Sequence, residues 1–327
     1  MESIRNICII GSGAIGTALG NVLAKKKMHN VTLLSIEKEV VESINNTRFN
    51  IKYFSNTKLS KHLKATMDTR ILTKADIVFI AIPSIHVVDY VLQERKKIGK
   101  ETILLNLAKG FSNDRRTITE SLESELPNPV CSFKGPTFAR ELINKLPTGF
   151  TLGSADENHF PLFREIFQDT PVYIDFSNDV TGVEILSILK NIYAIAGGII
   201  DAHYNSPNLR FLFLTRAFDE MRHILLEFGG TESTMFNYCG YGDFSLTALN
   251  DLSRNRTLGL LIGKGFFTEN ISDKVLLEGK LAAGVFCEQI AEKHNMDGKY
   301  PIISEIYKVF NENYDISRFV NNLLKMI

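Results

Sequence analysis

The sequence predicts an α/β fold: a doubly wound, mostly parallel sheet followed by an all-helical C-terminal domain. Short apolar runs alternate with helical patterns through the first half of the 327-residue chain. The runs at 75–83 and 101–110 are apolar on both faces, which is typical of parallel strands covered by helices on both sides. After about residue 179 the strand patterns cease and only helical patterns follow.

The expected elements follow one another in a regular order. Apolar and β-branched runs predict strands at 6–11, 30–35, 75–83, 101–110, 128–136, 149–155 and 171–176. Helical spacing predicts helices at 17–27, 37–46, between the strands at 75–83 and 101–110, and at 115–126 and 157–168. It then predicts helices at 186–200, 209–229, 281–295 and 301–314. We therefore expect domains at 1–178 and 179–327, packed around a cleft.

The composition argues against several classes of function. Lys plus Arg and Asp plus Glu both number 37, so there is no net charge to hold nucleic acid or an anionic membrane. Single cysteines and scattered histidines predict reduced thiols in the cytoplasm and no metal site. No run approaches the roughly 20 apolar residues of a membrane span. A small-molecule partner bound by local groups is the remaining expectation.

A glycine-rich turn, Gly11-Ser12-Gly13-Ala14-Ile15-Gly16, follows the first expected strand and opens the first expected helix. This spacing allows a tight turn and brings backbone N–H groups close to a pyrophosphate, which the positive end of the helix also favours. The alternative is a turn needed only for packing. The strand–turn–helix context favours a dinucleotide site in a Rossmann-like domain.

Glu37 follows the second expected strand. An acid at that place accepts hydrogen bonds from the ribose hydroxyls and repels a 2′-phosphate, which favours NAD(H) over NADP(H). Lys38 is able to meet a phosphate, and a first-turn helix acid is an alternative explanation of Glu37. NADP(H) therefore stays open.

Lys190 and Asn191 interrupt the apolar helical run at 186–200. Burial of an unpaired ammonium costs several kcal/mol, so either the head group reaches solvent or the position has a function. The rest of the chain decides between these alternatives.

Seven segments carry a family resemblance: IGSGAIGTALG, NLAKGF, KGPTFARELINKLPTG, VEILSILKNIYAIAGGIID, LTRAFDEM, YGDFSLTALNDLSRNRTLG and LLEG. In this order they resemble the soluble NAD(P)-dependent glycerol-3-phosphate dehydrogenases. The resemblance implies reversible hydride transfer between NADH and C2 of dihydroxyacetone phosphate, a phosphorylated three-carbon substrate. The product is sn-glycerol 3-phosphate, used in phospholipid synthesis. A cytoplasmic homodimer is also implied.

The resemblance also implies roles for individual residues. Lys190 is the proton donor and acceptor, Lys109 contacts cofactor and substrate, and Asp243 completes the catalytic set. The substrate-binding set comprises Lys109, Gly135, Thr137, Lys190, Asn191, Asp243, Thr247, Ser253, Arg254 and Asn255. The cofactor-binding set comprises Gly11, Ser12, Gly13, Ala14, Ile15, Gly16, Glu37, Lys109, Ala139, Arg254, Leu276 and Glu278.

This chemistry is consistent with the residue types. Ketone reduction places negative charge on oxygen, so a positioned acid is needed. Desolvation and a neighbouring ammonium favour the neutral amine of Lys190, whereas Asp243 favours its charged form. Arg254 offers a planar fork for phosphate, with Arg256 adding charge. The alternatives are a solvated basic face and, for Ser253, a helix cap.

The chain departs from the family pattern at Ile15, at Ile36 and at Lys134, the last where a small residue usually precedes GPTFA. The segments Tyr53-Phe54-Ser55-Asn56 and Leu214-Thr215-Arg216-Ala217 also depart from it. Two other functions stay open. One is a related two-domain dehydrogenase of 3-hydroxy acids or sugar acids, which SRNR and GPTFA disfavour. The other is a non-catalytic nicotinamide-sensing protein, which has no need of an acid and a phosphate clamp.

Overall fold

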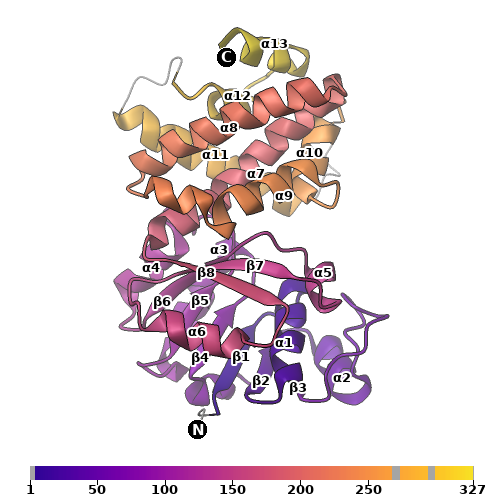
Figure 1. Cartoon of the computed structure of the whole chain (residues 1–327), viewed down its shortest axis with the longest axis vertical. Coiled ribbons are helices and arrows are strands. Elements are labelled where there is room, and N and C mark those ends of the chain that lie inside the picture. The colour runs from indigo at the N-terminus through magenta and orange to yellow at the C-terminus, as the bar shows by residue number, and fades with distance from the viewer. Residues whose placement is uncertain (1–3, 267–272, 294–298, 327) are drawn as a thin grey trace. The chain divides into compact units, whose positions relative to one another are not determined.

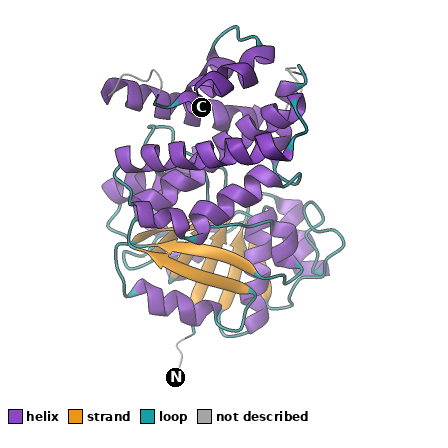
Figure 2. Ribbon diagram, turned by 45° about the horizontal axis from the view of Figure 1, so that its top comes forward, coloured by secondary structure: helices purple, strands orange, loops and turns teal. Residues whose placement is uncertain are grey.

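The computed structural model describes residues 4–266, 273–293 and 299–326 (Figure 1). The chain divides into two compact units, Met1–Val180 and Thr181–Ile327. The division falls after residue 180, whereas the sequence analysis places the domain boundary at 178. Every described strand belongs to the first unit, and the described elements of the second unit are all helical (Figure 2).

The first unit contains a single eight-stranded sheet in the order β3-β2-β1-β4-β5-β6-β7-β8. Neighbouring strands are parallel except for the antiparallel pair β6–β7, which confirms the mostly parallel, doubly wound prediction. The strands are β1 (Asn6–Ile10), β2 (Asn30–Leu34), β3 (Leu63–Thr66), β4 (Ile77–Ile80), β5 (Ile103–Asn106), β6 (Val130–Lys134), β7 (Thr148–Gly153) and β8 (Val172–Ser177). The strand order turns back between β1 and β4, and ligands of such sheets bind at the carboxyl edge near this point.

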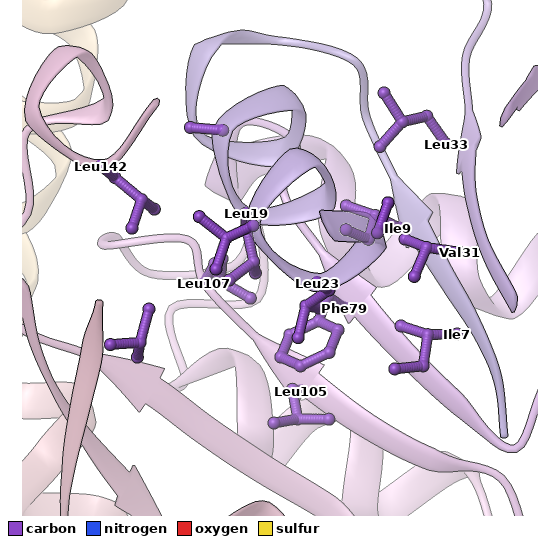
Figure 3. Close-up of a cluster of buried hydrophobic side chains, with 14 of the residues drawn as sticks. Ile7, Ile9, Leu19, Leu23, Val31, Leu33, Phe79, Leu105, Leu107 and Leu142 are labelled. Carbon is purple, nitrogen blue, oxygen red and sulfur yellow. The ribbon is translucent and has the colours of Figure 1, made fainter. Parts of the chain in front are cut away.

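Helices cover this sheet because successive side chains of its strands point to opposite faces. On β1, Ile7 and Ile9 join one apolar cluster, whereas Cys8 and Ile10 join a second one. Figure 3 shows Leu19 and Leu23 among the residues of the first cluster. The helices of this unit are α1 (Ala14–Lys26), α2 (Lys38–Thr47), α3 (Ser84–Glu94), α4 (Ile118–Glu125), α5 (Ala139–Ile143) and α6 (His159–Phe167).

The second unit is built around the apolar run that the sequence analysis singled out. This run forms α7 (Val180–His203), which is long and apolar enough to cross a membrane, although 94% of its most apolar window is buried. A helix that is apolar on all sides is typical of a protein core. The other described helices are α8 (Pro207–Glu227), α9 (Asp243–Leu249), α10 (Arg254–Gly263), α11 (Asp273–Lys293), α12 (Pro301–Asn311) and α13 (Phe319–Met326).

A buried carboxyl group joins three of these helices. Glu220 of α8 accepts hydrogen bonds from the backbone N–H groups of Ile302 and Ile303 at 3.0 and 2.8 Å, in the first turn of α12. It also accepts one from the Tyr193 hydroxyl of α7 at 2.9 Å. Burial raises the pKa of Glu220 to about 7, although these hydrogen bonds oppose the shift.

Glu220 is expected to make the stability pH-dependent. Because its folded-state pKa is raised, its contribution is fully present below pH 4.5 and is lost as the pH rises to about 7. Glu220→Gln does not titrate, so the difference between the two proteins isolates this group. We expect the parent protein to lose on the order of 3 kcal/mol relative to the variant across this range, measured by urea unfolding. A constant difference would show that Glu220 does not titrate there.

Candidate functional site

The glycine turn has the geometry of a phosphate-binding loop. Gly11 has φ +105°, and a Cβ at Gly16 would lie 2.1 Å from the Gly11 carbonyl oxygen, so neither position accepts a side chain. A Cβ at Gly13 would meet nothing within 4 Å, which leaves room above the start of α1. The first turn of α1 contains no acidic residue. These features fit a dinucleotide pyrophosphate at the positive end of the helix.

Asn50 holds this turn in place, and the sequence analysis missed it. Its side-chain amide donates to the Ser12 carbonyl and to the Thr17 hydroxyl, both at 2.9 Å. Ser12 and Ser35 are joined by a hydroxyl–hydroxyl hydrogen bond of 2.6 Å. Asn50 is fully buried and more than 30 residues from both of its partners, so no local sequence pattern marks it.

Glu37 lines a cavity of about 560 Å³, together with Lys38, Glu39, Val40, Ile51 and Lys52. It immediately precedes α2 but makes no side-chain capping bond; its carboxylate forms an ion pair with Lys52 instead. These contacts do not test the alternative of a helix acid, because the helix dipole favours a carboxylate at the N-terminal end of α2 without a capping bond. Lys52, rather than Lys38, is the lysine bonded to this carboxylate, and the sequence analysis did not identify it.

Two further loops leave the same edge of the sheet. Because β1, β4, β5 and β6 are mutually parallel neighbours, the segments that follow them all leave at the carboxyl edge. Lys109 follows β5 and donates to the Gly135 carbonyl, just after β6, at 2.9 Å. Thr137 donates to the same oxygen at 3.1 Å. Lys109, Gly135 and Thr137 are thus brought together, and Ala139 opens α5 two residues further on.

In the second unit Lys190 belongs to a buried polar cluster. Its Nζ lies 2.7 Å from Asp243 Oδ1 and 2.7 Å from Thr247 Oγ1. The three residues, here called the Lys190 cluster, are 5%, 1% and 7% exposed. Asp243 and Thr247 are one turn apart on α9, so both face α7. The alternative of a head group in bulk solvent is excluded. Asn191, next along α7, is partly buried.

The Ser-Arg-Asn-Arg segment divides into structural and exposed parts. The Ser253 hydroxyl accepts a hydrogen bond from the Arg256 backbone N–H at 3.3 Å, so Ser253 caps α10. Arg256 is 7% exposed and pairs with Asp201 of α7 and with Asp251. Its charge is therefore used within the fold, in contrast to the expectation that it adds to a phosphate site. Arg254 is exposed and Asn255 is partly buried.

Close packing fixes α10 against the helix that carries Lys190. A Cβ at Gly259 would lie 2.0 Å from the Ile195 carbonyl oxygen, so α10 approaches α7 at a distance that only glycine allows. The start of α10, with Arg254 and Asn255, is thereby positioned relative to α7.

Both halves of the chain match models of one protein family. Residues 6–160 match the N-terminal model of NAD-dependent glycerol-3-phosphate dehydrogenase, and residues 179–321 match its C-terminal model. The chain belongs to the NAD-dependent glycerol-3-phosphate dehydrogenase family. Its resemblance to that family is thereby confirmed.

Individual dehydrogenases of this family are similar over nearly their whole length. A glycerol-3-phosphate dehydrogenase [NAD(P)+] of Clostridium acetobutylicum is 32% identical over 323 residues, covering 97% of this chain and 96% of the relative. One from Methanothermobacter thermautotrophicus is 32% identical, covering 98% of each chain. The crystal structure of glycerol-3-phosphate dehydrogenase from Coxiella burnetii superposes with a TM-score of 0.89 at 28% identity, covering 98% and 99% of the two chains.

A ketopantoate reductase of Ralstonia eutropha shares the fold more distantly, with a TM-score of 0.52 at 16% identity over 87% of this chain. Other two-domain reductases thus have a related fold, whereas this chain matches the dehydrogenase family end to end. The remaining expected cofactor residues of this dehydrogenase, Leu276 and Glu278, fall in α11, and their side chains lie outside the described residues.

Proposed function

We propose that this dehydrogenase reduces dihydroxyacetone phosphate at C2 to sn-glycerol 3-phosphate, reversibly, with NAD(P)H as reductant and Lys190 as the acid. The observation that carries the proposal is the Lys190 cluster. A buried ammonium bonded to a carboxylate and a hydroxyl is a proton donor held in one orientation.

The proton transfer follows from this arrangement. When bound, the reduced nicotinamide supplies a hydride to the ketone carbon. Lys190 gives one proton to the ketone oxygen as negative charge develops there, and its neutral amine takes the proton back in the reverse direction. Asp243 and Thr247 orient the Nζ atom, and the negative charge of Asp243 compensates the buried ammonium.

The phosphate of the substrate is assigned to the start of α10. Arg254 is the exposed guanidinium of the segment, and its planar fork matches two phosphate oxygens. Asn255 adds a neutral donor next to it. Ser253 is committed to capping through its Oγ lone pair, although its hydroxyl proton is able to donate to the same phosphate.

Most of the cofactor contacts are assigned to the first unit, whereas Arg254, Leu276 and Glu278 of the second unit would supply the others. The turn Gly11–Gly16 and the start of α1 would hold the pyrophosphate, and Lys109 and Ala139 would contact the nicotinamide half. Glu37 would accept hydrogen bonds from the ribose hydroxyls. Its ion pair with Lys52 compensates the carboxylate charge that would repel a 2′-phosphate, which supports the use of both NADH and NADPH.

We also infer a cytoplasmic homodimer. Several large apolar side chains of the second unit are exposed, among them Tyr204, Phe211, Phe236 and Tyr241. Exposed apolar side chains mark an association site where they form one contiguous patch, and a homodimer would cover such a patch. Light scattering of the purified protein is expected to give twice the mass of one chain, and a monomer at micromolar concentration would contradict the inference.

A turnover assay tests the function directly. Purified protein, NADH and dihydroxyacetone phosphate are expected to give loss of the absorbance of the reduced nicotinamide, and the reverse reaction is expected from sn-glycerol 3-phosphate. Turnover of 3-hydroxy acids or sugar acids alone would favour the related dehydrogenases. Tight NADH binding without turnover of any substrate would favour a sensing protein.

A further inference from the structure

Lys134 is a buried lysine that the proposed mechanism does not use. It is the last residue of β6 and has no exposed surface. The family resemblance predicts a small residue at this position. A long cationic side chain in a protein core is costly unless its N–H groups are bonded, so its contacts need an explanation.

These contacts are made with the loop that carries Lys109. Lys134 Nζ donates to the backbone carbonyl of Asn106 at 2.9 Å and also to that of Ala108. The two carbonyls belong to the end of β5 and to the residue immediately before Lys109. Asn106 reinforces the turn, because its side-chain oxygen accepts a hydrogen bond from the Ala108 N–H at 2.9 Å.

The contact is reciprocal. Lys109 Nζ donates to the carbonyl of Gly135, the residue that follows Lys134. The side chain of Lys109, which follows β5, therefore bonds to the backbone just after β6. The side chain of Lys134, at the end of β6, bonds in turn to the backbone at the end of β5 and just after it. Both bonds lie at the carboxyl edge of two parallel strands, where the cofactor and the substrate are expected to bind.

We propose that Lys134 is a positioning residue for the reaction: it fixes the backbone of residues 106–108 and thereby sets where the Lys109 ammonium lies. The proposal rests on the proposed function, in which Lys109 contacts cofactor and substrate. Lys134 itself touches neither. A displacement of about 1 Å in a group of this kind is enough to cost about 10²-fold in rate.

Lys134→Met separates positioning from folding. Methionine has a similar length and no donor, so the variant removes the cost of a buried ammonium but leaves the carbonyls of Asn106 and Ala108 without this donor. We expect these two effects to offset one another, so that the thermal midpoint changes little while kcat/KM for dihydroxyacetone phosphate falls by about 10–100-fold. Lys134→Gln retains an amide donor and is expected to recover part of this loss. Equal activity of Lys134→Met and the parent protein would overturn the proposal.

A double-mutant cycle with Lys109→Met tests whether Lys134 acts through Lys109. If it does, adding Lys134→Met to Lys109→Met changes kcat/KM by less than about twofold. Losses that multiply would contradict the proposal. Should Lys134→Met fail to fold, Lys134→Gln takes its place in the cycle with the same two outcomes.

Hydrogen exchange provides a readout that does not depend on turnover. The amides of residues 107–110 are expected to exchange faster in Lys134→Met than in the parent protein. Lys26→Met is the matched control, because Lys26 also donates to a backbone carbonyl, that of Glu165, at 2.6 Å. It should leave both the exchange of this loop and kcat/KM unchanged. Unaltered exchange of these amides in Lys134→Met would contradict the proposal, whichever substrate the enzyme uses.

Discussion

Replacement of Lys190 by methionine is expected to lower kcat for dihydroxyacetone phosphate by about 10²–10⁴-fold, the usual contribution of a general acid. The physical reason is that the variant has no proton to give to the ketone oxygen. NADH binding, followed by nicotinamide fluorescence, is expected to change by no more than a few-fold, because Lys190 does not belong to the expected cofactor-binding set. Turnover close to that of the parent protein would refute the assignment.

A second variant separates the loss of the acid from a loss of stability. Asp243 is 1% exposed, and removal of its ammonium partner leaves a carboxylate whose burial costs about 3–5 kcal/mol. The double variant Lys190→Met/Asp243→Asn removes both charges and is expected to be more stable than the single variant Lys190→Met. If this double variant is folded and still inactive, the loss of activity comes from the missing catalytic groups and not from a loss of stability.

Arg254→Ala is expected to raise KM for dihydroxyacetone phosphate by about 10–100-fold, because a hydrogen bond to a charged group contributes roughly 1.5–3 kcal/mol. The thermal midpoint should be unchanged, since Arg254 is exposed. Unphosphorylated dihydroxyacetone supplies the control. The parent protein should strongly prefer the phosphorylated ketone, and the variant should lose most of this preference. An unaltered preference would count against a phosphate site at Arg254.

Arg256→Ala is the matched comparison, because it removes an identical side chain two residues along α10. Its guanidinium is paired with Asp201 and Asp251, so the expected loss is about 1–3 kcal/mol in the free energy of unfolding. KM should stay within a few-fold of the parent value. A large rise in KM in both variants would contradict the assignment of phosphate binding to Arg254 and of a structural role to Arg256.

The sheet and most helices are predictable from the sequence because burial on both faces leaves a strong pattern. The strands at 6–11, 30–35 and 75–83 correspond to β1, β2 and β4. Five of the described α-helices and strands are absent from the prediction, namely β3, α5, α9, α10 and α13, and the two shortest of these carry too little pattern to be predicted. β3 is a four-residue edge strand with an exposed Lys64, and α5 is only five residues long. Both are stabilised by tertiary contacts rather than by their own periodicity.

The site is predictable only in part. The glycine turn is local in sequence, so its role follows from spacing and context. Lys190 lies 53 residues from Asp243 and 57 residues from Thr247 in the sequence, and only the family resemblance predicted them together. Three further residues form hydrogen bonds with partners distant in sequence: Asn50, Lys52 and Lys134. Neither a sequence pattern nor the family resemblance indicated these contacts.

Chemical rescue of Lys190→Ala by a small primary amine tests the central claim most directly. With dihydroxyacetone phosphate and NADH saturating, ethylammonium is expected to enter the space left by the lysine, beside the Asp243 carboxylate, and to restore turnover. The rate should rise with amine concentration and follow the fraction of amine that carries a proton. Rates that stay flat with every amine in a folded, NADH-binding variant would contradict proton delivery by this ammonium.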